Sequence, residues 1–168
     1  MNDALNDGRW AAEAGLAAEE LQTIKSFGLI TLKPMLLVGN IAEHEISRPE
    51  ANPHFAARAR LGAERGCPVL PICSKLEAEI QELPPEDRGH FLAEAGLAEP
   101  GLNVLIRASF ELLGLQSYFT VGPKEVRAWT VPVGATAPQA AGVIHTDFEK
   151  GFIRAQVIGY DDYVAHGG

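Results

Sequence analysis

The sequence predicts an α/β unit over residues 1–114, followed by a smaller α+β unit over residues 115–168. In the first part, short continuous apolar runs alternate with stretches of helical periodicity, a pattern typical of buried parallel strands joined by helices. Beyond Gly114, aromatic and β-branched residues alternate with polar ones, as in half-exposed strands. A length of 168 residues suits one ordinary domain or two small ones, and it excludes a large multidomain enzyme.

The first unit opens with apolar residues at three- and four-residue spacing from 11 to 27, which predicts an amphipathic helix ended by Gly28. The apolar run at 35–40 predicts a strand buried on both faces. A helix is expected from Pro53 to about Arg65, and a second strand over 68–73. Together these segments predict a strand, helix, strand unit.

Two further helices are expected in this unit, one over about 75–95 with a break at Pro84-Pro85 and one from Gly101 to Leu113. In the second unit, residues 118–121 and 126–131 predict strands, and a Thr136…Gln139 capping box predicts a helix to about His145. Alternation over 152–158 predicts a third strand. The expected order of the second unit is therefore β, β, α, β.

The composition restricts the function classes. A formal net charge of −8 favours solubility and argues against a protein that binds nucleic acid over its whole surface. The two cysteines, Cys67 and Cys73, form neither a CxxC motif nor a disulfide framework, which fits a reducing compartment. Neither a targeting segment nor an apolar run of transmembrane length is present, so we expect a soluble cytoplasmic protein.

Asn40-Ile41-Ala42-Glu43 follows the first predicted strand and is the strongest candidate for a base-binding loop. Ligands of parallel sheets bind beyond the carboxyl ends of strands. An Asn amide matches the N7 and N6 groups of adenine, and Ile41 could cover the face of the ring. Glu43 could then determine which hydrogen-bonding groups are accepted at the edge of the base. The alternative is that Asn40 only turns the chain and Glu43 is solvated, because Asn is common in loops.

Cys73 and Ser74 follow the second predicted strand and could complete the same pocket. Ser74 is an equally good helix cap, and Cys73 is expected to be a buried structural residue. No G-x-x-x-x-G-K-[ST] motif occurs, so the sequence offers no phosphate cradle. The His145-Thr146-Asp147 segment is expected to cap a helix rather than to bind a metal, so no metal site is predicted. The histidines stand in no catalytic motif, so no catalytic residue is predicted.

A possible partner surface lies in the second unit, where Trp129 accompanies four basic residues: Lys124, Arg127, Lys150 and Arg154. A cation beside an aromatic ring suits a contact with RNA or protein. The interleaved acidic residues make an ordinary solvated surface equally consistent with this pattern.

The segments 124–130 and 134–155 resemble the carboxyl-terminal TGS region of the YchF/Obg-like ATPases. The resemblance extends upstream through Leu32-Lys33-Pro34, Asn40-x-x-Glu43, Glu77-Ala78-Glu79-Ile80 and Gly101-Leu102-Asn103, and it covers nearly all of the chain after about residue 20.

The resemblance implies part of a P-loop nucleotide-binding domain over 1–114 and an incomplete β-grasp TGS domain over 115–168. It also implies a ribosome-associated ATPase in which Asn-x-x-Glu recognises adenine, so Asn40, Ile41, Glu43, Cys73 and Ser74 would contact the base. The family's phosphate-binding motif lies upstream of the matched region, and its β-grasp continues past Gly168. We therefore expect weak or no ATP binding, no hydrolysis by this chain alone, and Mg²⁺ only in a full-length member.

Three readings follow from this resemblance. The preferred one is the base-recognising part of a ribosome-associated ATPase. The second is a non-catalytic module that contacts ribosomal RNA or protein, and the third is a nonfunctional truncation. An incomplete sheet would leave an open edge, which predicts self-association.

Overall fold

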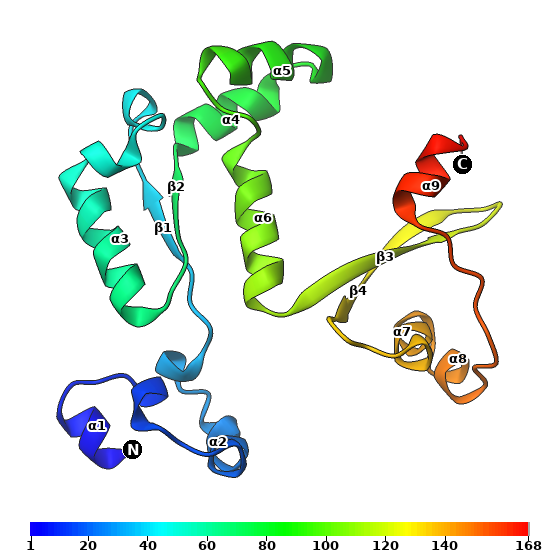
Figure 1. Cartoon of the computed structure of the whole chain (residues 1–168), viewed down its shortest axis with the longest axis horizontal. Helices are drawn as coiled ribbons and strands as arrows, with labels where there is room; N and C mark the ends of the chain where they lie inside the picture. The colour runs from blue at the N-terminus through cyan, green and yellow to red at the C-terminus, as the bar shows by residue number, and fades with distance from the viewer. Residues whose placement is uncertain (168) are drawn as a thin grey trace. The chain divides into compact units, whose positions relative to one another are not determined.

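A computed structural model describes residues 1–167 and divides the chain into two compact units, Met1–Leu112 and Leu113–Gly168 (Figure 1). The division lies close to the boundary expected from the change in sequence pattern. Each unit has its own helices and its own two-stranded sheet.

The first unit is built around two parallel strands, β1 (Leu37–Asn40) and β2 (Val69–Ile72). Leu37 pairs with Val69 and Asn40 with Ile72, so both strands end at the same edge of the sheet. Helix α3 (Pro53–Arg65) joins them and contacts both, which confirms the predicted strand, helix, strand unit. The prediction that both faces of the first strand are buried is wrong, because Val38 is 38% exposed.

Helix α3 has well-defined ends. The side chain of Asn52 accepts hydrogen bonds from the N–H groups of His54 (2.8 Å) and Phe55 (3.1 Å), which are two of the donors that a helix leaves unpaired. Gly66 ends the helix in the left-handed conformation, with φ 64°. Helix α3 therefore begins and ends where its sequence signals predict.

A buried cluster lies where two helices meet after β2, α4 (Ser74–Glu82) and α5 (Pro85–Glu94). The two helices are separated at the predicted break at Pro84-Pro85. Helix α6 (Gly101–Leu112) follows and contacts β2. The buried cluster is made of four residues: Cys73, Leu76, Ile80 and Leu92. The start of α4, where the base loop was predicted, is thus anchored by the core.

The predicted helix over 11–27 is wrong. That stretch contains the 3₁₀ turn η1 (Ala11–Ala14), helix α2 (Ala18–Ile24) and the 3₁₀ turn η2 (Lys25–Phe27), after the short α1 (Asn2–Asn6). Gly15 divides it, because its φ of 63° belongs to the left-handed region. Three further 3₁₀ turns lie on either side of β1: η3 (Ile30–Leu32), η4 (Glu43–Glu45) and η5 (Pro49–Ala51).

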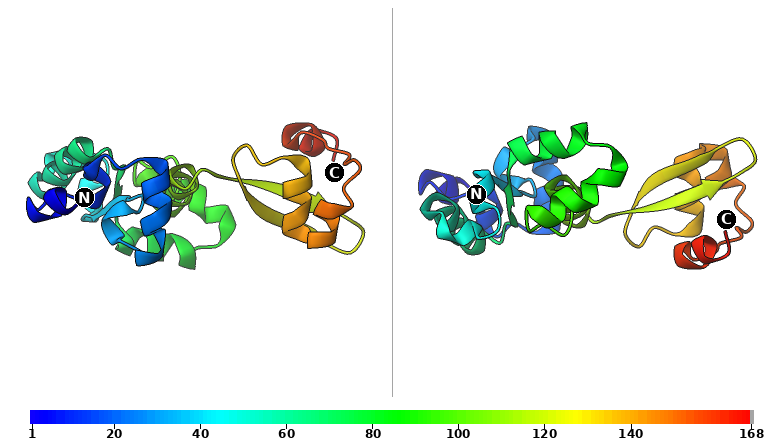
Figure 2. Two further views of the ribbon diagram at one scale, coloured as in Figure 1. Left: turned by 90° about the horizontal axis from the view of Figure 1, so that it is seen from below. Right: turned by 90° about the horizontal axis from the view of Figure 1, so that it is seen from above.

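The second unit contains an antiparallel hairpin of β3 (Leu115–Val121) and β4 (Val126–Pro132), with α7 (Ala137–Ile144) on one of its faces (Figures 1 and 2). The hydroxyl of Tyr118 donates to the carbonyl oxygen of Ala140 at 2.8 Å and so ties the hairpin to α7. Gln139 accepts from the N–H of Thr136 at 2.8 Å, as the capping pattern predicts. Helix α8 (Thr146–Lys150) follows.

The predicted strand over 152–158 is not formed. The segment pairs with no strand among residues 1–167, and its apolar side chains are outside the core, with Ile153 90% and Val157 86% exposed. Alternation favours a strand only where a neighbouring edge accepts its hydrogen bonds. Helix α9 (Tyr160–Ala165) is the last helix of the described residues, and its Tyr160 ring lies 6.0 Å from that of Phe119. The β, β, α, β order is therefore not completed.

Candidate functional site

The two predicted base loops lie together at the carboxyl edge of the parallel sheet. Asn40 is the last residue of β1, and Ser74 is the first residue of α4. The Asn40 side-chain oxygen Oδ1 accepts a hydrogen bond from the Ser74 N–H at 3.0 Å. Since Oδ1 is engaged, the amide nitrogen Nδ2 remains as the donor that Asn40 can offer to a ligand.

A second contact joins the same loops through charged side chains. The Lys75 ammonium donates to Glu43 Oε2 at 3.0 Å and lies 3.5 Å from Glu79 Oε1. The hydrogen bond to Glu43 raises the pKa of Lys75, and the two carboxylate charges add to the effect. Both members of the closer pair are largely exposed, Lys75 at 70% and Glu43 at 50%, so the pair is open to solvent.

A network that the sequence reasoning missed supports the Asn40–Glu43 loop. Glu45 accepts from the Ala42 N–H at 3.0 Å and from the Asn52 amide at 2.8 Å, while Asn52 caps α3. The hydrogen bond from the Ala42 N–H is the main reason that the pKa of Glu45 is lowered. The acidic residue three positions after Ala42 was the available sequence signal. The loop is thus fastened to α3 as well as to α4.

Ile41 and Cys73 lie beneath this edge rather than on it. Ile41 is 9% exposed, and its N–H extends the ladder by donating to the Ile72 carbonyl at 2.9 Å. Cys73 is 4% exposed within the core, as expected for a structural thiol. As placed here, Ile41 offers little surface for covering a ring, whereas Asn40, Glu43 and Ser74 are exposed.

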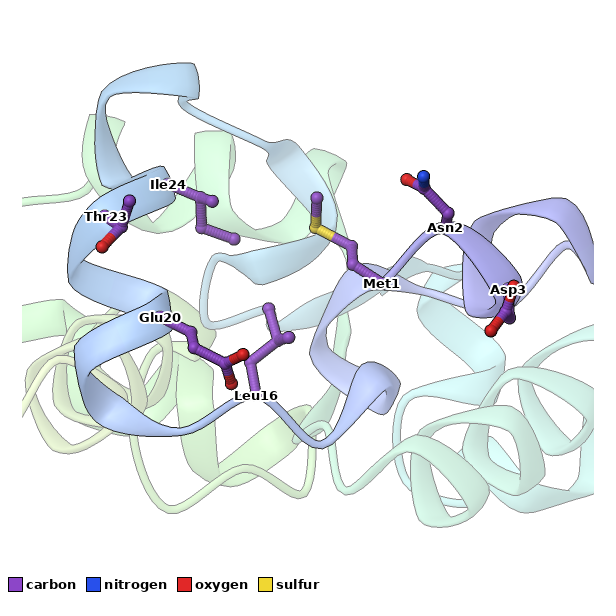
Figure 3. Close-up of a pocket in the computed structure, with 7 residues that line it drawn as sticks. All are labelled: Met1, Asn2, Asp3, Leu16, Glu20, Thr23 and Ile24. Carbon is purple, nitrogen blue, oxygen red and sulfur yellow. The ribbon is translucent and has the colours of Figure 1, made fainter.

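Two hollows among the described residues lie elsewhere. One of about 650 Å³ opens between α1 and α2, where Met1, Leu16 and Ile24 point into it (Figure 3). Another of about 560 Å³ lies between the end of β4, α7 and Glu149. Neither is lined by the base loops. The polar residues of the base loops, Asn40, Glu43 and Ser74, lie exposed at the edge of the sheet.

The predicted basic surface is dispersed over the second unit. Arg127 stacks over the ring of Trp129 at 4.2 Å, as expected from their shared strand face, and Trp129 donates from Nε1 to Thr120 Oγ1 at 2.9 Å. Lys124 lies in the hairpin turn, Lys150 lies in α8, and Arg154 lies in the unpaired segment 152–158. The stacking of Arg127 on Trp129 therefore joins two residues of this surface by side-chain contact.

The His145 segment caps a helix, as predicted, because His145 Nδ1 accepts from the Asp147 N–H at 3.2 Å. Within residues 1–167, no three His, Cys, Asp or Glu side chains gather as metal ligands would. None of the helices described there has the length and apolar character needed to cross a membrane.

Sequence and structure comparisons identify the relatives of this chain. The family model YchF-GTPase_C, described as a protein of unknown function (DUF933), matches residues 115–168. "Ribosome-binding ATPase YchF" of Haemophilus influenzae is 53% identical over 154 residues, which make up 92% of this chain and 42% of that protein. The Bacillus subtilis protein of the same name is 42% identical over 168 residues, or 100% of this chain and 46% of the relative.

A solved structure, the YchF GTPase of Schizosaccharomyces pombe, matches the fold with a TM-score of 0.81 at 30% sequence identity, covering 97% of this chain and 43% of that chain. The chain thus spans less than half the length of these relatives. The carboxyl-terminal family model, the similarity over almost the whole chain and the shared fold agree with one another. The chain belongs to the YchF family.

Proposed function

We propose that this chain supplies the adenine-recognising part of the nucleotide site of a ribosome-associated ATPase. The observation that carries the proposal is the hydrogen bond between Asn40 and the Ser74 N–H at the carboxyl edge of the parallel sheet. It brings together the two loops that the family resemblance assigns to the base. Ligands of α/β sheets bind at such an edge.

The chemistry of the edge suits adenine. Asn40 Nδ2 would donate to N7, and the Glu43 carboxylate would accept from the exocyclic amino group. Guanine presents a carbonyl oxygen at the same position, which a carboxylate repels. Ile41 and Cys73 would act from below by fixing the loops, and contact with the ring through Ile41 would require its side chain to turn outward.

The phosphate half of the site is not supplied by this sequence, which contains no G-x-x-x-x-G-K-[ST] motif. Phosphoryl transfer depends on that backbone cradle, its Lys and a Mg²⁺ ion. We therefore expect weak ATP binding and no ATP hydrolysis by this chain alone. Hydrolysis above the background rate that follows the protein through purification would contradict this expectation.

Titration with ATP, followed by calorimetry or by amide chemical shifts, tests the base site. The wild-type chain should bind weakly, with the largest shifts at residues 40–43 and 73–75, and Asn40→Ala should abolish them. Asn6→Ala, which removes the same side chain from the exposed end of α1, serves as the matched control. Shifts that persist in the Asn40→Ala variant would refute the assignment.

A second function, contact with ribosomal RNA or protein through a TGS-type β-grasp unit, rests on the stacked pair of Arg127 and Trp129. Relatives of the chain carry the name ribosome-binding ATPase. The chain should sediment with ribosomes, and Arg127→Ala, Arg154→Ala or added salt should reduce the bound fraction. Such a protein would work in translation in the cytoplasm. Unchanged cosedimentation of both variants would refute this surface.

Self-association is proposed from the hairpin of the second unit. It pairs with no third strand among residues 1–167, so its outer hydrogen-bonding groups are available to a second chain. Sedimentation equilibrium should show dimers or larger species as the concentration rises. A monomer at high concentration would contradict the proposal.

A further inference from the structure

Lys75 contributes a contact to the base-loop edge that the family motifs do not assign. The first turn of α4 reaches the β1 loop twice, through the Ser74 N–H to Asn40 and through the Lys75 ammonium to Glu43, both at 3.0 Å. Because Ser74 and Lys75 are consecutive, the two contacts form one clamp on both polar residues of the loop. The start of α4 is itself held by the buried cluster around Leu76.

We propose that Lys75 is a positioning residue that holds the Glu43 carboxylate toward the six-position of a bound purine and thereby favours a 6-amino over a 6-oxo base. This inference rests on the proposed function, since it concerns the same base site.

The geometry leaves one carboxylate oxygen available. Lys75 occupies Glu43 Oε2, so Oε1 remains to accept from an exocyclic amino group. An exposed glutamate without a partner would sample several rotamers and lose entropy on binding. The ammonium also lies between Glu43 and Glu79, at 3.0 Å and 3.5 Å, and so reduces the repulsion between these carboxylates.

ATP and GTP titrations of four proteins test the inference: wild type, Lys75→Met, Glu43→Gln and the double variant. Lys75→Met should weaken ATP binding about two- to fivefold at low salt, the range expected for an exposed ion pair. Added salt should shrink the difference, because it screens the pair. In the Glu43→Gln background, Lys75→Met should have no further effect.

Two controls separate charge from position. Lys25→Met removes the same charge from η2, and Glu79→Gln removes the other partner of Lys75; neither should weaken ATP binding. Thermal melts of each variant confirm that its fold is unchanged. If Lys75→Met weakens ATP binding as much in the Glu43→Gln background as in the wild type, the inference is overturned. It is also overturned if Lys75→Met affects GTP binding alone, because the ammonium would then contact the base directly.

The failure of this inference is distinguishable from failure of the proposed function. If Asn40→Ala abolishes ATP binding while Lys75→Met equals the wild type, the Lys75 role is refuted and the base site stands. If the wild type shows no shifts at the base loops with ATP, both proposals are refuted.

Discussion

Replacement of Glu77 should destabilise the first unit by removing the cap of α6. The Glu77 carboxylate accepts hydrogen bonds from the N–H groups of Gly101 (2.7 Å) and Leu102 (3.1 Å), the first two residues of that helix. Helix N-termini favour negative charge, and hydrogen bonds to ionised groups are the stronger ones. The cap therefore acts through two bonds and the helix dipole.

The magnitude follows from these contacts. A hydrogen bond to a charged group contributes about 1.5–3 kcal/mol, and a charge at a helix N-terminus about 0.3–1 kcal/mol. Because Glu77 is only half-buried, water replaces part of what is lost. We therefore expect Glu77→Ala to lower the free energy of unfolding by about 1–3 kcal/mol, and Glu77→Gln by about half as much.

Urea denaturation followed by far-UV circular dichroism measures this effect. Glu79→Ala is the matched control, because Glu79 lies two residues along the same helix and forms an ion pair with the exposed Lys75. That variant should change the free energy of unfolding by less than about 0.5 kcal/mol. The reasoning is refuted if Glu77→Ala and Glu79→Ala have the same midpoint and the same slope.

Two other predictions concern packing and pH. Gly62→Ala should cost about 1–3 kcal/mol in the same urea assay, because its Cβ would lie 2.1 Å from Val69 Cγ2. Gly89→Ala, with open space around it in α5, should instead stabilise by about 0.5–1 kcal/mol; a smaller loss at Gly62 than at Gly89 would contradict the packing argument. The folded-state pKa of Glu45 is lowered, so its contribution to stability is present above the ordinary glutamate pKa and is lost as pH falls through the lowered value. Glu45→Gln should therefore lose less stability than the wild type on acidification to pH 3, and identical acid titration curves would contradict the role of Glu45.

Local sequence signals determined most of the secondary structure. Helix α3 begins at a capping Asn and Pro and ends at Gly66, and the break between α4 and α5 falls at Pro84-Pro85. The physical reasons are local, because a capping side chain, a proline ring or a left-handed glycine acts within one turn of chain. The same local signals placed Asn40 at the end of one strand and Ser74 just after another.

Tertiary contacts decided what these signals could not. The alternating 152–158 segment pairs with no strand among residues 1–167, so its alternation was not sufficient to make a strand. The break of the predicted 11–27 helix at Gly15 is instead a local effect that the apolar spacing did not reveal. The contacts that join Asn40 to Ser74 and Glu43 to Lys75 link residues more than thirty positions apart. No local pattern encodes such a distance, so the sequence alone identified the polar residues of the edge, and only the folded parallel sheet brought them together.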